Sequence, residues 1–494
     1  EKFYTVYARF AREEATYDGI WFKNKQNRLK EREAADEVAG KVWGGVGVVQ
    51  KAEKKAATDK PPLLYDLTEL QRNANVRYGF TADRTLRAAQ ALYEERKLIT
   101  YPRTSSRYLS KDMVSTLKKR VDVAGTLPKL ELFAAELLSL PKLPISKRVV
   151  DDSKVTDHHA IVPTNKKPSG NLPLDEAKVY ELVARRFLAV FFPTARFENT
   201  SVVTEVRGET FLSRGRVVLE AGWRRLYPDG VGGKKEKELP VLPPVSVGQE
   251  WAVTKVAVRE GETKPPPRYS EAALLGAMET AGKLVEDEVL RQAMKDSGLG
   301  TPATRAAIIE RLLKVDYLER DKKMLLPTEK GRTLISLLGE SPLASPELTA
   351  HWEERLASIE KGAENRSNFM AGISAFATAF VEEVRRRKDE KVATSPAKRH
   401  SNDTGSASLG TCPKCRAPVM ETKKSYSCSA WKKGCKFAIW KDVSGKRISA
   451  AQARQLLAKG RTGQLKGFKS KAGKSYSAAL VLDTEHKVRL EFGG

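Results

Sequence analysis

The chain has 494 residues, 40% of them hydrophobic, so it is long enough to bury the cores of three or four domains. Its 88 lysines and arginines outnumber 62 aspartates and glutamates, and the net charge of +26 favours a polyanionic partner, most simply nucleic acid. No apolar run approaches the roughly 20 residues of a membrane span, which argues against a membrane protein, and no signal peptide is visible.

The first hundred residues are predicted to run from strands into helices. Residues 1–60 contain strand-like runs, then become rich in Lys and Glu, and two prolines end this part. Because the chain starts inside a strand-like run and without Met, we expect a further N-terminal part to precede Glu1. Residues 63–100 carry apolar side chains at helical spacing, with Thr81 as the expected N-cap.

The rest of the chain alternates between predicted strands, helices and a linker. Residues 192–258 are rich in β-branched strand patterns, and residues 268–392 are mostly helical. Thr301, followed by a proline, predicts the start of a helix. A tight hairpin is expected at 317–326, and a polar linker at 393–410.

All four cysteines lie in one short stretch. A secreted disulfide protein would spread its cysteines, so this clustering favours a metal site in a reducing compartment. Cys412 and Cys415 form a C-x-x-C pair, and Cys428 and Cys435 follow. Four thiolates at such spacing can close a tetrahedron around a structural zinc ion, with no position left open for catalysis. The alternatives are a ribbon that has lost its metal, or free thiols.

Aromatic residues and lysines interleave with these cysteines. This composition suits stacking on unpaired bases combined with neutralisation of phosphates. The alternative for the aromatic residues is that they fill a small core. Among them are Tyr426, Trp431, Phe437 and Trp440.

The segment 98–106 reads LITYPRTSS and places the phenol of Tyr101 beside Arg103 and the small hydroxyl residues Thr104 and Ser105. A phosphoryl-transfer nucleophile needs a phenol to attack, a fixed positive charge for the phosphate, and a backbone that the proline stiffens. A tyrosine before a proline is more often structural, so the interpretation depends on the rest of the chain.

Three further segments accompany Tyr101. Residues 67–71 read LTELQ, residues 156–164 read TDHHAIVPT, and residues 298–306 read GLGTPATRA. Together with the tyrosine segment they resemble type IA DNA topoisomerases. The variants TYPRTSS and DHHAIVPT, with LTAHWE at 348–353, resemble the bacterial topoisomerase III branch. The resemblance covers nearly the whole chain.

The resemblance implies a reaction centred on Tyr101. This residue would attack a backbone phosphodiester and leave a 5′-phosphotyrosine and a free 3′-hydroxyl, and the covalent link would allow rejoining without ATP. Because a phenol has a pKa of about 10, Arg103 is expected to hold the phosphate and stabilise the developing charge. His158 aligns with the family's active-site histidine, as a donor to phosphate or ribose. The alternative for His158 and His159 is a structural hydrogen bond at a turn.

The resemblance also implies contacts with the DNA backbone. Thr304 and Arg305 begin a predicted helix, whose N-terminus favours phosphate. Thr104 and Ser105, beside the nucleophile, are further candidates for DNA binding. The alternative for Thr304 and Arg305 is plain helix capping and surface charge.

The implied cofactors are magnesium and zinc. In this family an N-terminal TOPRIM domain holds Mg²⁺ on acidic residues, and we expect those residues to lie upstream of Glu1, because the pairs at 151–152 and 287–288 lack the expected context. Zinc would occupy the cysteines as a structural ion. The implied partners are single-stranded DNA and negatively supercoiled or catenated DNA, with a RecQ-type helicase as a candidate protein partner. The implied location is the bacterial cytoplasm, in association with the nucleoid.

The implied fold class is multidomain α+β: a toroid with a β-rich arch, a mixed α/β tyrosine domain and a helical base, plus a zinc-ribbon-like module at the C-terminus. We expect the arch in two parts, 1–60 and 188–260. The other parts would be the tyrosine domain at 61–187, the helical DNA-binding base at 261–392, the linker at 393–410 and the basic module at 411–494.

The resemblance predicts an ATP-independent isomerase that cleaves one strand, passes another and rejoins the first, with relaxation of negative supercoils and decatenation as outcomes. We expect this chain alone to be inactive without the magnesium-binding domain. Three alternatives remain open: a non-catalytic module that binds single-stranded DNA, a relaxing enzyme of the topoisomerase I type, and a winged-helix regulator based on residues 301–328.

Overall fold

The structure is a computed structural model and describes residues 1–233, 238–285, 287–294, 298–339, 341–386, 408–422, 424–470 and 474–492. The chain divides into two compact units, Glu1–Ala393 and Thr394–Gly494. Most of the predicted linker at 393–410 lies outside the described residues. None of the described helices is long and apolar enough to cross a membrane.

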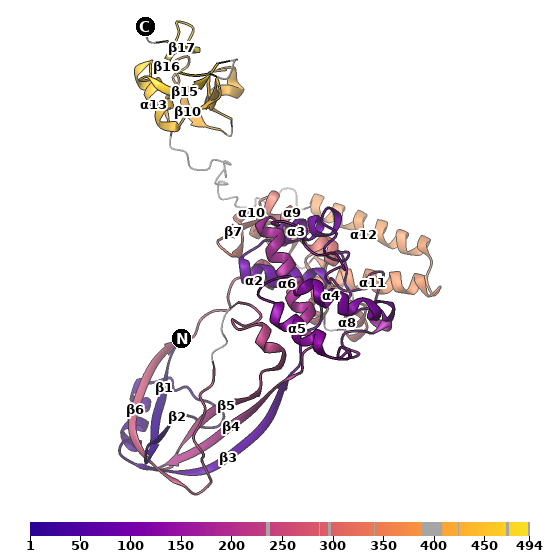
Figure 1. The fold of residues 1–494 in the computed structure, drawn as a ribbon, viewed down its shortest axis with the longest axis vertical. Helices are drawn as coiled ribbons and strands as arrows, with labels where there is room; N and C mark the ends of the chain where they lie inside the picture. The colour runs from indigo at the N-terminus through magenta and orange to yellow at the C-terminus, as the bar shows by residue number, and fades with distance from the viewer. Residues whose placement is uncertain are drawn as a thin grey trace. The chain divides into compact units, whose positions relative to one another are not determined.

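A closed barrel of six antiparallel strands forms the β-rich part of the first unit, in the order β1-β2-β5-β4-β3-β6 (Figure 1). Pairing of β1 with β6, from Lys2 opposite Glu262 to Ala11 opposite Ala252, closes the barrel. Alternate residues of β1 are buried because successive side chains point to opposite faces of a strand. The strands are Lys2–Arg12 (β1), Ala15–Trp21 (β2), Val46–Asp59 (β3), Ala195–Val206 (β4), Glu209–Glu220 (β5) and Glu250–Glu262 (β6).

One helix, Arg32–Val42 (α1), was not expected among the strands of residues 1–60. It buries Ala35 and Val42 against the barrel core, and its other positions are mostly charged or small. Its charged residues give a polar stretch in the sequence, because a helix that buries so few residues has a weak apolar periodicity.

Helices that carry the tyrosine segment lie between the two halves of the barrel in sequence. The Thr81 hydroxyl accepts a hydrogen bond from the Arg84 N–H at 3.0 Å, so the predicted N-cap is confirmed. The α-helices are Leu67–Tyr78 (α2), Ala82–Glu94 (α3), Leu117–Ala124 (α4), Glu131–Ser139 (α5) and Leu174–Ala189 (α6), and the 3-10 helices are Lys111–Thr116 (η1) and Asp152–Lys154 (η2). A further 3-10 helix, Gly222–Leu226 (η3), lies between β5 and β6.

The part after the barrel is mostly helical, with one hairpin where it was predicted. The hairpin pairs Leu318–Asp321 (β7) with Met324–Pro327 (β8). The helices are Glu271–Glu279 (α7), Ala281–Leu284 (η4), Glu288–Ala293 (α8), Pro302–Lys314 (α9), Glu329–Leu338 (α10), Pro342–Ala344 (η5), Pro346–Glu360 (α11) and Arg366–Arg386 (α12).

The second unit has a core of its own, which includes Val419, Ile439, Leu456 and Phe468. A four-stranded sheet ordered β12-β11-β10-β9 and the segments that connect its strands contain the cysteines, and a three-stranded sheet ordered β15-β16-β17 follows. Its elements are Gly410–Thr411 (β9), Pro418–Glu421 (β10), Ser425–Cys428 (β11), Ser429–Lys433 (η6), Ala438–Trp440 (β12), Asp442–Val443 (β13), Lys446–Arg447 (β14), Ala450–Lys459 (α13), Leu465–Lys469 (β15), Ser475–Leu482 (β16) and Val488–Glu491 (β17).

Candidate active site and cysteine cluster

Backbone pairing brings the predicted nucleophile next to the predicted histidine. The N–H of Thr100 donates to the carbonyl of Val162 at 3.0 Å, and the N–H of Ala160 donates to the carbonyl of Tyr108 at 2.9 Å. The Thr100 hydroxyl adds a bond to the Ala160 carbonyl and accepts one from the Val162 N–H, both at 3.0 Å. The segments 98–108 and 156–164 therefore meet, although some fifty residues separate them in the chain.

The ring of Tyr101 contacts two other rings. Its centroid lies 4.4 Å from that of His158, with the planes tilted by 45°. The ring of Tyr93, near the end of α3, meets it edge-on at 5.4 Å. Tyr101 is half-buried and His158 is exposed. The neighbouring rings therefore limit the positions open to the phenol, while the site stays accessible to a ligand.

Arg103 and Ser105 lie on the exposed side of the same segment. Arg103 makes no hydrogen bond or ion pair with any residue that the structure describes, so its guanidinium is available for an anion. The Ser105 hydroxyl lies 3.4 Å from that of Thr156. Both are placed where a phosphate backbone could reach them.

Thr104, in contrast, is buried and its hydroxyl is engaged within the protein. The hydroxyl donates to the carbonyl of His158 at 2.9 Å and accepts from the N–H of Ser106 at 3.0 Å. The carbonyl of Thr104 accepts from the N–H of Leu67, the first residue of α2, at 3.1 Å. Thr104 thus connects the nucleophile's segment to the backbone of His158. Its predicted contact with DNA stays a prediction.

The neighbouring His159 is half-buried, and its Nδ1 lies 2.9 Å from the carbonyl oxygen of Ala160. This contact corresponds to the structural alternative considered for the histidine pair. Of the two histidines, His158 is the one whose ring lies against Tyr101.

Asp66, a residue that the sequence did not single out, caps α2 beside this site. Its carboxylate accepts from the N–H of Glu69 at 2.7 Å, and Arg107 lies 4.0 Å away. Burial raises the pKa of Asp66 to about 7, because the bond from Glu69 and the charge of Arg107 offset only part of the desolvation. The carboxyl can therefore change its protonation near neutral pH.

The two predicted DNA contacts on α9 occupy different environments. Thr304 is exposed, and its hydroxyl accepts from the N–H of the N-cap Thr301 at 2.9 Å. Arg305 is buried and donates to the hydroxyl of Thr68 in α2 at 2.8 Å. Burial lowers the pKa of the Arg305 guanidinium, which Glu279 and Asp66 partly counteract. Roles in DNA binding for both residues stay predictions.

The glycines of the motif that precedes α9 have a conformational reason. Gly298 and Gly300 adopt φ of +60° and +70°, in the left-handed region that other residues rarely enter. A Cβ on Gly298 would lie 2.5 Å from the carbonyl oxygen of Met278. The glycines therefore set the approach of the chain to Thr301.

The four cysteines gather as the spacing predicted. Their sulfur atoms lie within 4.8 Å of one another, with 3.7 Å between Cys412 and Cys435 and 3.3 Å between Cys415 and Cys428. The Ala430 N–H donates to the Cys428 sulfur at 3.4 Å. Such a cluster could hold a metal ion, and four sulfur ligands are compatible with zinc.

The local environments of these thiols differ. A hydrogen bond from the backbone N–H of Ala417 lowers the pKa of Cys415 to about 7. Burial raises the pKa of Cys428 to about 12 and also raises that of Cys412. Cys415 is therefore the thiol most ready to ionise, and a bound cation would be needed to hold all four as thiolates.

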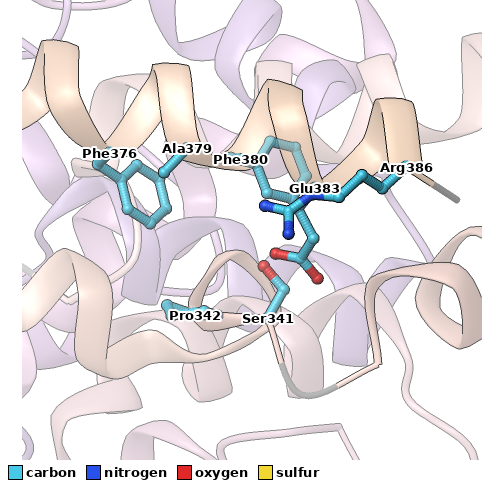
Figure 2. A pocket seen from close by; sticks show the side chains of 7 residues that line it. All are labelled: Ser341, Pro342, Phe376, Ala379, Phe380, Glu383 and Arg386. Atoms are coloured by element: carbon cyan, nitrogen blue, oxygen red, sulfur yellow. The ribbon is translucent and has the colours of Figure 1, made fainter.

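Two cavities lie elsewhere in the first unit. One of about 520 Å³ lies between α12 and η5, where the rings of Phe376 and Phe380 face Ser341 and Pro342 (Figure 2). A larger one, of about 910 Å³, lies where β4 and β5 meet η3, and Trp223 is among its lining residues. Neither cavity is lined by Tyr101, Arg103 or His158.

Sequence reasoning missed two residues of the site, Tyr93 and Asp66. Tyr93 belongs to the stretch 63–100 predicted as helical from its spacing, and nothing local indicates that its ring meets Tyr101. Asp66 precedes the LTELQ motif and could have been identified as the N-cap of α2, since aspartate is favoured there. The burial of its carboxyl could not have been predicted in this way.

The sequence resembles known proteins over most of its length. The family model for DNA topoisomerase matches residues 1–371, and that for the C-terminal repeat of topoisomerase matches residues 434–493. DNA topoisomerase 3 of Shouchella clausii is 39% identical over 416 residues, which cover 82% of this chain and 55% of the relative. For DNA topoisomerase 3 of Bacillus subtilis the identity is 38% over 407 residues, or 81% and 54% of the two chains.

Among solved structures, full-length topoisomerase I from Thermotoga maritima is similar, with a TM-score of 0.56 and 23% identity. The match covers 77% of this chain and 58% of that one. This likeness bears on the fold alone. The chain spans about half the length of the curated relatives it matches. It belongs to the type IA family of DNA topoisomerases, as the motifs around Tyr101 indicated.

Proposed function

We propose that this chain supplies the nucleophile and much of the DNA-binding surface of an ATP-independent type IA topoisomerase. The observation that carries the proposal is the contact between Tyr101 and His158, with the exposed Arg103 two residues along the chain and bound to no residue that the structure describes. A phenol, a cationic fork and an imidazole in one accessible place suit attack on a phosphodiester.

Each residue has a separate task in the proposed reaction. The Tyr101 oxygen forms a bond to phosphorus as the bond from phosphorus to the 3′ oxygen breaks, so the phenol loses a proton and the 3′ oxygen gains one. Arg103 holds the non-bridging phosphate oxygens, where charge develops. His158 donates to a phosphate or ribose oxygen beside the phenol. Rejoining is the reverse, with the 3′-hydroxyl as the nucleophile.

Thr104 and Asp66 are proposed to position this group. The bond from the Thr104 hydroxyl to the His158 carbonyl fixes one reacting segment against the other. Asp66 holds the start of α2, which also binds the carbonyl of Thr104. Ser105, Thr304 and Arg305 remain proposed contacts to the DNA backbone.

The proposed metals differ in their fit to this chain. Zinc would be held by the four cysteines and would supply structural cross-linking of the second unit. The described residues do not form a site that fits magnesium, because the four cysteines are the one cluster of potential metal ligands among them. The acidic pairs are engaged, with Asp152 on Lys111 at 3.4 Å and Glu288 on Arg291 at 2.6 Å. No step is therefore assigned to magnesium here.

The proposed substrates are single-stranded DNA and negatively supercoiled or catenated duplexes, acted on in the cytoplasm at the nucleoid. The net charge of +26 supports a polyanionic substrate. The motif variants TYPRTSS and DHHAIVPT favour decatenation over relaxation as the main activity. A RecQ-type helicase is the proposed protein partner.

Covalent trapping tests this function. The chain would be fused to the part of the Bacillus subtilis relative that it does not span, then incubated with Mg²⁺ and single-stranded DNA labelled at its 3′ end. After denaturation, label on the protein is expected, because the strand stays attached through its 5′ phosphate.

The control is Tyr101→Phe, which removes one oxygen and should abolish the adduct while salt-sensitive DNA binding persists. A folded fusion that binds the DNA but forms no adduct would overturn the proposal in favour of a non-catalytic binding module. An adduct that persists in Tyr101→Phe would assign the chemistry to another residue.

A further inference from the structure

The helices that carry the tyrosine segment lie against the helical part that follows the barrel, and a small apolar cluster joins them. Ala82, at the start of α3, is the member from the tyrosine side. The members from the other side come from α7, α9 and β8: Leu275, Met278, Ala306, Ile309 and Leu325. A cluster with one small residue on one side stabilises the contact only modestly.

The polar contacts across the same interface are more specific. Glu271, the first residue of α7, is only 4% exposed. Its Oε2 accepts from the N–H of Ala82, the first residue of α3, at 2.7 Å. Its Oε1 accepts from Nε of Arg320 in β7 at 2.8 Å. The Glu271 carboxylate of α7 thus accepts from an N–H at the start of α3 that has no partner within its own helix.

The reciprocal contact is made by Asn75 of α2. Its side-chain oxygen accepts from the N–H of Ala272, the second residue of α7, at 3.2 Å. Its amide nitrogen donates to the carbonyl of Phe80, in the loop before α3, at 2.8 Å. Each side of the interface therefore supplies an acceptor for the unsatisfied N-terminal N–H groups of a helix on the other side.

We propose that Glu271 and Asn75 form a latch that holds the helices bearing Tyr101 on the helical base, and that this latch opens when a strand passes. The inference rests on the proposed function, because strand passage needs the nucleophile to move away from the base. Tyr93 of α3 contacts the Tyr101 ring, so α3 and the nucleophile lie on the same side of this interface.

The contacts suit a latch because opening leaves few charged or polar groups without a partner. Arg320 also pairs with Glu310, and both residues belong to the base, so the Glu271–Arg320–Glu310 set stays whole when the sides part. The N–H groups of Ala82 and Ala272 then exchange their partners for water. Closing restores these two hydrogen bonds, and the bond from Arg305 of α9 to the Thr68 hydroxyl of α2 crosses the same interface.

Hydrogen exchange of the full chain, measured by mass spectrometry without DNA, tests the latch. Glu271→Ala should raise the exchange rate at least about tenfold in peptides from both faces, 75–86 and 271–279, because the closed state then buries an unsatisfied N–H. Glu271→Gln keeps an acceptor for Ala82 and should show a smaller increase. Glu329→Gln is the matched control: a glutamate at the start of α10, exposed, paired with Arg332 and remote from this interface.

Increased exchange on both faces, with α4 and α11 unchanged, would establish the latch. An increase confined to α7 and β7 would assign Glu271 to the stability of the base and overturn the proposal, as would no increase in either face. Because the measurement needs neither DNA nor catalysis, failure to trap an adduct would refute the proposed function without altering this result.

Discussion

The cysteine cluster and the tyrosine site are built in opposite ways. The four cysteines span 412–435, and short strands and turns within that stretch bring their sulfur atoms together. The tyrosine site joins α3, the segment after it and a loop some fifty residues later, through backbone hydrogen bonds and one buried hydroxyl. The first site is a property of a local motif, and the second is a property of a folded domain.

This difference has a consequence for stability. Loss of a ligand in the cysteine cluster should unfold a small unit with its own core and leave the rest unchanged. Small changes beside the tyrosine site should alter its reaction more than the stability of the first unit, because many contacts together hold the site in place. Four variants test this contrast.

The largest effect is expected from the metal ligands. Cys428→Ser, or treatment with a chelator, should destabilise the second unit by on the order of 5 kcal/mol or more, since metal binding and folding are coupled in such modules. Calorimetry should show the loss of one transition, with the melting of the first unit unchanged. A shift in both transitions would mean that the cluster is not an independent unit. Metal content, measured on the same samples, would identify zinc.

Arg103→Ala should reduce adduct formation by the fusion protein about a hundredfold, because it removes the cation from developing phosphate charge. Arg103→Lys should recover part of the lost adduct formation, since the lysine ammonium keeps the positive charge but lacks the planar set of donors of the guanidinium. Arg214→Ala, at an exposed position in β5, serves as a control for net charge. Equal losses for Arg103→Ala and Arg214→Ala would leave Arg103 with no specific role.

Asp66→Asn tests whether tertiary burial raises the pKa of the Asp66 carboxyl, which lies beside the site. The folded pKa of about 7 exceeds the unfolded value of about 3.9, so the stability that Asp66 contributes is fully present below pH 4 and is lost as the pH rises through 7. Asparagine also caps helices. The free energy of unfolding of the variant should therefore match that of the parent near pH 4 and exceed it by roughly 4 kcal/mol at pH 8, because the two pKa values differ by about three units. Identical urea-unfolding curves at pH 8 would show that the carboxyl is hydrated.

Thr104→Val should have the smallest effect on stability, roughly 1 kcal/mol, because it removes a hydroxyl that makes two hydrogen bonds. The adduct yield should fall further than this loss alone would cause, as His158 is no longer held by its carbonyl. Thr104→Ser should restore both. If Thr104→Ser restores only one of the two, the adduct yield or the stability, Thr104 contacts DNA directly.

The sequence identified most of the residues that the structure brings together, though not how they meet. Tyr101 and His158 were grouped from their motifs, and their rings are in contact. Arg305 was grouped with them as a DNA contact, yet the fold buries it against Thr68. Tyr93 could not be assigned to the site, because a tyrosine at helical spacing has the same pattern whether it fills a core or touches a nucleophile.

By itself the sequence determined what depends on local chemistry: the cysteine spacing, the N-caps at Thr81 and Thr301, the hairpin at 317–326, and motifs specific enough to indicate the family. The tertiary structure alone decided what depends on burial and on distant segments. It closed a barrel from strands on both sides of the tyrosine segment, buried Asp66, and set Glu271 on the first N–H of α3. Hydrogen-bond capacity is local, but desolvation and the choice of partner are fixed only when remote parts of the chain pack together.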